Sequence, residues 1–310
     1  LRVVEHEQLA RGQHVADVGK TRLGDPSAAP DEQFRGAALG EREPGDPLVR
    51  KRVVETVYIY MSLHICRNLC GKVTIFCNFA ALNGQKTMKT DFLVIGSGAA
   101  GLSFALKAAA HGHVTVVTKG EIAECNTNYA QGGICSVTYA PDTFEKHIAD
   151  TLVCGAGKCD GKAVELVVRR APELIGDLIA WGTRFDTTPD GRFELNREGG
   201  HSEHRILHHE DLTGAEIERA LVESVRRHPN ITVLERHFAI DLLTHHHLGE
   251  FVTRHTRGLT CFGAYVLNER TNEIETMLSK FTVVATGGCG NIYSTTSNPV
   301  VATGDGIAMC

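Results

Sequence analysis

The run D-F-L-V-I-G-S-G-A-A-G, residues 91–101, decides the fold that this 310-residue chain must adopt. Residues 92–95 are apolar, which is typical of a buried central strand in a parallel sheet. The glycines that follow, in the spacing G-x-G-x-x-G, are Gly96, Gly98 and Gly101. Residues 102–110 are rich in helix formers, and the apolar run at 114–118 supplies a second strand. This order of strand, glycine turn, helix and strand predicts a dinucleotide site.

Each glycine of this turn has a structural role that a larger residue could not fill. The first permits the tight turn, the second lets the backbone approach a pyrophosphate, and the third packs the helix against the strand. The N-terminus of the helix offers unpaired N–H groups and a partial positive charge to the phosphates.

The end of the second strand departs from the usual dinucleotide pattern. An ordinary NAD or FAD fold places Asp or Glu there for the ribose hydroxyls, whereas this strand ends in Thr118-Lys119. The nearest acids, Glu121 and Glu124, come later. The departure argues against an ordinary NAD dehydrogenase. A lysine at this position would instead neutralise a phosphate or hydrogen-bond the adenosine end of the cofactor.

Composition excludes several classes of protein. A hydrophobic content of 42% and a charged content of 22% are typical of a soluble globular protein of one large or two ordinary domains. The net charge of −5 gives no reason to expect nucleic-acid binding. The ten cysteines contain no C-x-x-C pair, so we expect reduced thiols and a cytoplasmic location. No stretch reaches the about 18 uninterrupted apolar residues that a membrane span needs.

The two ends of the chain differ from its middle. Residues 1–87 show no sustained periodicity, Leu1 is not an initiator methionine, and Met88 stands just before the first strand. We expect residues 1–87 to be a disordered leader or sequence outside the native coding region, with a targeting segment as the alternative. The FAD-binding portion is expected over residues 88–310, incomplete because the chain stops at Cys310 as a helix begins.

Between these ends the sequence predicts alternating helices and strands, so the expected fold class is α/β, a Rossmann-like parallel sheet with an added β section and helices. Thr213 and Glu216 are expected to form a capping box, and Pro172 is expected to split one helical pattern in two. Helices are predicted over 143–153, 160–181 and 213–228, a hairpin or loop over 185–195, and strands over 231–235, 238–244, 260–268 and 281–285.

Seven short motifs together resemble one family of flavoproteins. They are G-S-G-A-A-G-L at 96–102, T-K-G at 118–120, N-Y-A-Q-G-G-I at 128–134, R-E-G-G-H-S at 197–202, R-I-L-H at 205–208, A-T-G-G at 285–288 and T-G-D-G-I-A-M at 303–309. Their order resembles that of the L-aspartate oxidases, in the succinate dehydrogenase and fumarate reductase superfamily. The resemblance implies FAD as the cofactor, oxidation of L-aspartate to iminoaspartate in the quinolinate route of NAD biosynthesis, and oxygen or fumarate as electron acceptor. It also suggests a quinolinate synthase as pathway partner.

The resemblance implies a set of cofactor-binding residues. It includes the turn Gly96, Ser97, Gly98, Ala99, Ala100 and Gly101, the strand-end Lys119, the flavin loop Asn126, Thr127, Asn128, Tyr129, Ala130, Gln131, Gly132 and Gly133, and the late acid Asp305. The family's catalytic arginine and histidines lie downstream of T-G-D-G. We therefore assign no catalytic residue within this chain.

Two positions separate the members of the superfamily. The succinate and fumarate enzymes carry, where Asn126 stands, a histidine that bonds covalently to FAD. An amide is no such nucleophile, so non-covalent FAD is expected. Glu198 in R-E-G-G-H-S is absent from the dicarboxylate-only enzymes, and its carboxylate is expected to receive the substrate ammonium group. The alternative role for Glu198 is to cap a turn or to pair with Arg197 or Arg205.

Three functional hypotheses follow. The first is L-aspartate oxidase activity, with the chain inactive on its own. The second is a fumarate reductase-like enzyme, which Asn126 and Glu198 disfavour, and the third is a non-catalytic FAD-binding remnant. A metal site is a further hypothesis, because His201, His204, His208 and His209 lie within nine residues beside Glu203, and His204 and His208 have i, i+4 spacing. The resemblance to a metal-free family makes us expect no metal.

Overall fold

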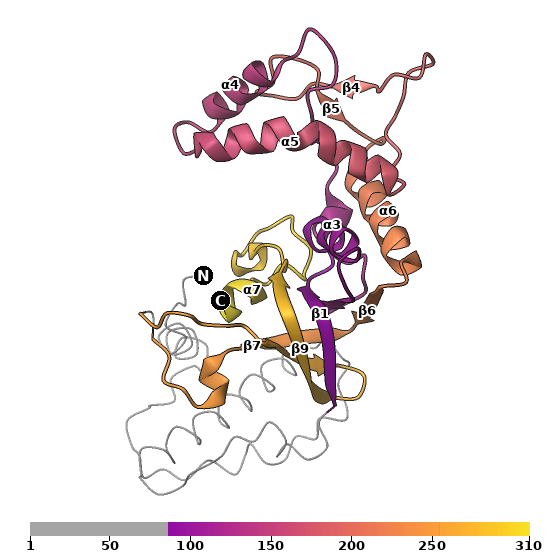
Figure 1. Ribbon diagram of the computed structural model, residues 1–310. Coiled ribbons are helices and arrows are strands. Elements are labelled where there is room, and N and C mark those ends of the chain that lie inside the picture. The colour runs from indigo at the N-terminus through magenta and orange to yellow at the C-terminus, as the bar shows by residue number, and fades with distance from the viewer. Residues whose placement is uncertain (1–85, 254) are drawn as a thin grey trace, which may run out of the picture. The chain divides into compact units, whose positions relative to one another are not determined.

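The computed structural model describes residues 86–253 and 255–310 (Figure 1). The helices are α3 (Ala99–Ala108), α4 (Phe144–Cys154), α5 (Gly161–Ala180), α6 (Thr213–Arg227) and α7 (Asp305–Met309), with 3-10 turns η3 (Thr127–Tyr129), η4 (His245–Leu248) and η5 (Gly290–Ile292). The strands are β1 (Thr87–Ile95), β2 (Val114–Thr118), β3 (Ile134–Cys135), β4 (Leu195–Asn196), β5 (Ile206–Leu207), β6 (Ile231–Glu235), β7 (His237–Leu243), β8 (Gly263–Asn268) and β9 (Glu273–Val284). The expectations for residues 1–85 lie outside the described residues.

The larger sheet has the strand order β6-β2-β1-β9-β8-β7. The described residues divide into two compact units, one formed by residues 91–235 and 283–304, the other by residues 86–90, 236–282 and 305–310. Strands β1 and β9 contribute residues to both units. The predicted α/β class with a dinucleotide-binding parallel sheet and an added β section is confirmed, and the six-stranded sheet as a whole is mixed, with parallel and antiparallel pairs.

The first unit contains the parallel strands. β1 pairs in parallel with β2, and β2 with β6, so that β2 lies between two partners and is buried at all five positions. Helix α3 covers these strands together with α5 and α6. Their shared core contains Val94, Leu102, Val114, Val116, Ile175, Leu178, Leu221 and Val225. The apolar strands and helix predicted around the glycine turn are confirmed. β1, however, begins at Thr87, five residues before the predicted start and inside the expected leader of residues 1–87.

A second, three-stranded sheet also lies in the first unit. It has the order β3-β5-β4, with antiparallel pairing of Cys135 with Ile206 and of Asn196 with Ile206. The sequence gives no periodic signal for strands of two residues, so this sheet was not predicted. The turn over residues 185–195 is the expected hairpin, closed by a bridge between Thr187 and Phe193.

The other unit is antiparallel. β7 pairs with β8, and β8 with β9, with a register shift between Ala239 and Asp241. Helix α7 packs against β7. The predicted strand at 281–285 is only the end of β9, which begins at Glu273. The first part of β9 contains charged residues, so it lacks the continuous apolar run from which the strand was predicted.

The prediction that Pro172 splits a helix is wrong, because α5 runs without interruption for 20 residues with Pro172 inside it. A proline in a helix interior costs about 3 kcal/mol. Here Val168, before the proline, and Ile175 and Leu178, after it, are all buried on one face. Packing of both halves against the same core favours one helix over two.

The predicted capping box is also wrong. Thr213 is the first residue of α6 rather than its cap, and its hydroxyl accepts from the His209 N–H at 3.0 Å. The Glu216 carboxylate accepts from the Arg184 N–H at 2.9 Å and pairs with Arg219. Both side chains that the local pattern assigns to a cap therefore bind residues outside the helix terminus or along the helix instead.

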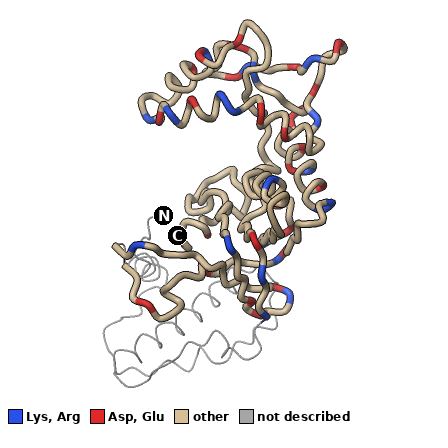
Figure 2. The backbone as a smooth tube through the Cα atoms, in the orientation of Figure 1, with Lys and Arg blue, Asp and Glu red and all other residues tan. Residues whose placement is uncertain are grey.

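Basic and acidic residues are interspersed along the described chain, as Figure 2 shows for α5 and its neighbours. Among the described residues, no helix combines the length and apolar character that crossing a bilayer requires.

Candidate functional site

The glycine turn after β1 fits so closely that side chains are excluded at two positions. Gly96 has φ 110°, and a Cβ there would lie 2.3 Å from the carbonyl oxygen of Ala285. A Cβ on Gly101 would lie 2.1 Å from the carbonyl oxygen of Gly96. The turn therefore brings the ends of β1 and β9 and the start of α3 together at the carboxyl edge of the sheet, where open α/β folds bind ligands.

The N-terminus of α3 has no side-chain cap. Gly98 is the N-cap and supplies no side-chain acceptor. The Ala99 N–H donates to Thr127 Oγ1 at 3.0 Å, while the N–H groups of Ala100 and Gly101 have no intrahelical acceptor. Ser97, buried beneath the turn, donates from its hydroxyl to Thr118 Oγ1 at 3.1 Å. Such an edge binds phosphate oxygens.

The loop that follows β2 lies against this turn and contains an unsatisfied acceptor. The side-chain oxygen of Asn126 is buried and has no hydrogen-bond partner among the described residues. A Cβ on Gly287, in the glycine turn after β9, would lie 3.5 Å from Asn126 Nδ2. A buried amide acceptor between two glycine turns fits a polar ligand that donates a hydrogen bond, and FAD has hydroxyl and ring N–H donors. The residues present therefore fit the cofactor.

Hydrogen bonds from α6 and within the loop hold the rest of residues 126–133, and the tip of the loop is exposed. The Gly214 N–H, in α6, donates to the carbonyl of Ala130 at 2.8 Å, and Tyr129 donates from its hydroxyl to Glu124. Asn128 is half-buried. Exposed residues form the tip: Gln131, Gly132 and Gly133.

Two distant motifs meet at the end of β2. Lys119 donates from its ammonium group to Thr303 Oγ1 at 2.5 Å, so T-K-G and T-G-D-G lie side by side. Asp305 begins α7 and belongs to the antiparallel unit, and is therefore described only by its place in that helix.

Glu198 lies against the loop of residues 126–133, for which the sequence predicts contact with the flavin. A Cβ on Gly132 would lie 2.6 Å from Glu198 Oε1, so the carboxylate lies directly against this glycine. The side chain is exposed, and within the described part of the chain it has no ion pair or hydrogen bond. Pairing with Arg205, one alternative for Glu198, is absent because Arg205 binds other carboxylates.

Arg205 is the centre of a buried ion network that the sequence did not predict. It is 0% exposed, and its guanidinium holds Asp142 through two bonds, Nε to Oδ2 at 2.8 Å and Nη2 to Oδ1 at 2.7 Å. Nη1 also donates to Asp150 Oδ2 at 2.5 Å. Burial raises the pKa of Asp150, but hydrogen bonds from Ser202 and Arg205 outweigh burial and lower it to about 2. No local signal marks this network, since its members lie 55 and 63 residues apart.

Glu218 is a second residue that was missed. It is 0% exposed on α6, and neither carboxylate oxygen has a hydrogen-bond partner of standard geometry among the described residues. Burial raises the pKa of Glu218 to about 7. Burial and the Glu218 carboxylate also raise the pKa of Cys125, which precedes Asn126. A signal was present: Glu218 falls in i, i+3, i+7 spacing with Leu221 and Val225, on the apolar face.

Within the described part of the chain, the four histidines of the metal hypothesis do not share one site: His208 and His209 lie beside Asp186, and His201 lies beside Cys135. His204 Nδ1 lies 3.1 Å from the Leu195 carbonyl, whereas His208 Nδ1 lies 3.1 Å from Asp186. Glu203 pairs with Lys146 instead.

Comparisons with known proteins agree with this geometry. The sequence model of the FAD binding domain family matches residues 91–310. A chloroplastic L-aspartate oxidase 2-a of Nicotiana tabacum is 51% identical over 219 residues, which cover 71% of this chain and 33% of that protein. An L-aspartate oxidase of Vibrio cholerae is 46% identical over 233 residues, covering 74% and 42%. An E. coli quinol fumarate reductase superposes with a TM-score of 0.65 at 28% identity, covering 72% of this chain and 37% of that one. The chain thus spans between a third and about two fifths of the length of these relatives.

Proposed function

The chain belongs to the FAD binding domain family of flavoproteins and is homologous to L-aspartate oxidases, and from this premise we propose that it is the FAD-binding part of an enzyme that oxidises L-aspartate to iminoaspartate. The bound FAD would accept the electron pair of the substrate, and the protein supplies orientation and electrostatics. The turn of residues 96–101 would hold the pyrophosphate, and Lys119 the adenosine side. The loop of residues 126–133 would line the flavin, and Asp305 would contact the cofactor.

One observation carries the choice of substrate. The carboxylate of Glu198 lies exposed against Gly132 in the loop proposed to line the flavin, and no described cation neutralises it. Aspartate differs from succinate by one ammonium group. An unpaired carboxylate at this position is the group that would bind that ammonium through a charge-assisted hydrogen bond.

Glu198→Gln tests this role in a chain extended to the full length of its relatives. Loss of a hydrogen bond to a charged group costs about 1.5–3 kcal/mol, which is roughly ten- to 150-fold in kcat/KM for aspartate. Fumarate has no ammonium group, so its reduction should change far less. Steady-state kinetics with both substrates on the same preparation gives the comparison.

Glu194→Gln is the matched control, because Glu194 is also exposed and stands four residues earlier in the same segment. It should leave both activities unchanged. Equal losses of aspartate oxidation and fumarate reduction in Glu198→Gln, with lower flavin occupancy, would show a structural Glu198. That result would favour the fumarate reductase-like alternative, which the structural likeness to E. coli quinol fumarate reductase keeps in consideration.

The proposal includes non-covalent FAD. The residue beside the two glycine turns is Asn126, whose amide forms no bond to a flavin. Acid precipitation of the flavin-loaded protein should release all yellow colour into the supernatant. Colour that stays in the pellet would show that another side chain forms a covalent link.

The proposal also covers the electron acceptor, the partner enzyme and the cellular location. Oxygen or fumarate would reoxidise the flavin, and an enzyme that makes quinolinate, a quinolinate synthase, would consume the unstable imine. We propose a cytoplasmic location, which fits the free thiols of the described cysteines, although the tobacco relative is named chloroplastic.

A further inference from the structure

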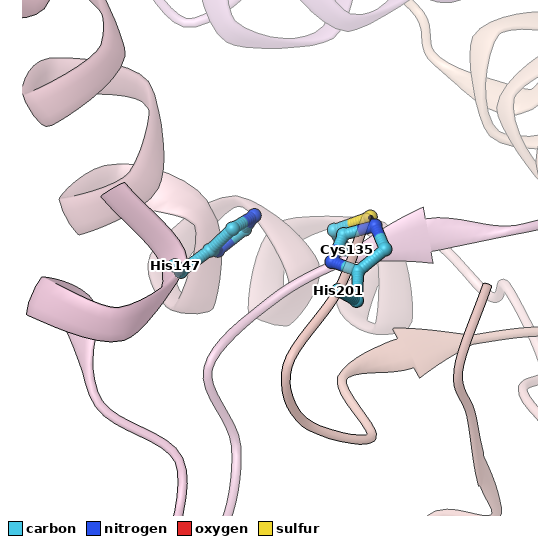
Figure 3. Close-up of side chains that lie close together, drawn as sticks. All are labelled: Cys135, His147 and His201. Atoms are coloured by element: carbon cyan, nitrogen blue, oxygen red, sulfur yellow. Dashed lines mark hydrogen bonds between the residues drawn. The ribbon is translucent and has the colours of Figure 1, made fainter. Parts of the chain in front are cut away.

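Three side chains outside the dinucleotide turn converge in one place (Figure 3). Cys135 ends β3, His147 is in the second turn of α4, and His201 follows the double glycine after Glu198. One ligand atom from each lies within 4.8 Å of the others. In Figure 3 the ring of His147 points across the gap toward Cys135 and His201. From this arrangement we propose that Cys135, His147 and His201 form a binding site for Zn²⁺.

The distance between two of the three ligand atoms, those of Cys135 and His201, matches the coordination geometry of zinc. Bond lengths of about 2.3 Å to sulfur and 2.05 Å to nitrogen, at a tetrahedral angle, place the two ligand atoms about 3.6 Å apart. Cys135 Sγ and His201 Nε2 lie 3.6 Å apart. Thiolate together with imidazole is a ligand set that selects zinc over calcium or magnesium. Three protein ligands leave a fourth position for water.

The Nδ1 atom of His147 lacks a hydrogen-bond partner among the described residues. The residue is 6% exposed, and its Nδ1 is buried. A buried polar atom without a partner costs free energy, and a bound cation would remove that cost.

The surrounding charges favour a cation. Arg205 lies beside the cluster, with Nη1 3.2 Å from His201 Nδ1, but Asp142 and Asp150 bind this guanidinium. Two carboxylates against one guanidinium leave a net negative charge. On binding, the Cys135 thiol releases its proton to solvent as the sulfur–zinc bond forms.

Arg205 also limits the affinity. Metal on Nε2 of His201 leaves the ring proton on Nδ1, where ordinary zinc sites provide a carboxylate or carbonyl acceptor. Here a guanidinium N–H faces that atom, and its contact must be replaced. We therefore expect a weaker site than a structural zinc site with four protein ligands.

The backbone positions of the ligands are held by other interactions. Cys135 is paired with Ile206 in the three-stranded sheet, Thr143 caps α4 through the Lys146 N–H, and Ser202 binds Asp150 through its N–H and hydroxyl. The site is preorganised in this sense. A bound ion would connect β3, α4 and the segment that carries Glu198.

Cobalt substitution tests the site on the purified 310-residue chain. Co²⁺ titration should give a thiolate-to-cobalt charge-transfer band and the visible bands of a tetrahedral ion, and added Zn²⁺ should abolish both. Cys135→Ser and His201→Asn should each remove the charge-transfer band or weaken binding at least tenfold. Cys261→Ser, another half-buried thiol, and His204→Asn, an exposed ring nearby, should change neither.

A second measurement needs no variant. Alkylation of Cys135 by iodoacetamide, followed by peptide mass mapping, should slow at least tenfold with Zn²⁺, while alkylation of Cys261 stays unchanged. A charge-transfer band that persists in Cys135→Ser would overturn the proposal. So would a titration without such a band, or equal alkylation of Cys135 with and without zinc.

Discussion

The dinucleotide turn and the Arg205 network are held together by opposite means. Around the turn, the close approach of Gly96 to Ala285 and of Gly101 to Gly96 leaves no room for side chains, and the neighbouring strand β2 is buried at all five positions. Around Arg205, a guanidinium and two carboxylates fill the space between α4 and the three-stranded sheet. Steric exclusion maintains the first region, whereas attraction between opposite charges maintains the second.

This difference determines which kind of substitution destabilises each region. A glycine turn fails when anything is added, because backbone atoms stand where a Cβ would go. A buried ion network fails when one member is removed, because its partners are left charged in the interior. Substitutions in the two regions should therefore differ in size and in their dependence on pH.

The largest effect is expected at the network. Arg205→Met leaves the buried carboxylate of Asp142 and that of Asp150 without their cation and should destabilise the protein by about 3–5 kcal/mol. Urea unfolding followed by circular dichroism measures it. Arg192→Met is the control, since Arg192 is exposed and stacks on Tyr139. A loss below about 1 kcal/mol in Arg205→Met would show that water replaces the guanidinium.

A smaller effect is expected at the turn. Gly101→Ala places a methyl group 2.1 Å from the Gly96 carbonyl oxygen and should cost about 1–3 kcal/mol, together with most of the FAD affinity. Flavin titration and urea unfolding measure the two losses. Gly176→Ala, in α5 with open space around it, should instead stabilise by about 0.5–1 kcal/mol. Unchanged FAD affinity in Gly101→Ala would mean that the turn yields without harm.

The last effect concerns the pH dependence of the unfolding free energy, whose sign differs between the two regions. Glu218, beside the flavin loop, has an ordinary pKa of 4.5 when unfolded and about 7 when folded. Between these values the folded state holds the extra proton, so stability falls as pH rises, by at most about 1.4 kcal/mol per pH unit. Asp150 has its pKa lowered from 3.8 to about 2, so its stabilisation is lost as pH falls through that range.

Glu218→Gln should flatten the decline in unfolding free energy between pH 4.5 and 7 and leave the acid limb intact. Denaturant unfolding at a series of pH values, with Glu223→Gln as an exposed control on the same helix, shows it. An unchanged profile in Glu218→Gln would mean that the carboxyl ionises normally in the folded protein.

The same division explains what could be predicted from sequence. The G-x-G-x-x-G turn, β2 and the buried face of α6 were predicted because each is specified by neighbours within a few residues. Lys119 was singled out because it stands where a dinucleotide fold has an acid. Its contact with Thr303 could not be predicted, since 184 residues separate them.

The misses have physical causes of the same kind. Thr213 and Glu216 have the local pattern of a cap, yet tertiary partners bind both side chains. Pro172 would end an isolated helix, but the core supports both of its halves. Cys135, His147 and His201 converge only after β3, α4 and the Glu198 segment have folded. Local patterns therefore specified the turn, whereas the network and the cluster depend on contacts that sequence spacing does not encode.

Trp181, the single tryptophan of the chain, lies where three helices meet. It ends α5, its carbonyl accepts from Ser224 of α6 at 2.7 Å, and Lys107 of α3 stands 5.9 Å from its ring centre. Its fluorescence therefore has one origin, inside the unit that contains the dinucleotide turn. Emission from Trp181 reports the melting of this unit alone, while the antiparallel unit contributes only to circular dichroism. Two melting curves that separate would show that the units lose structure in sequence rather than together.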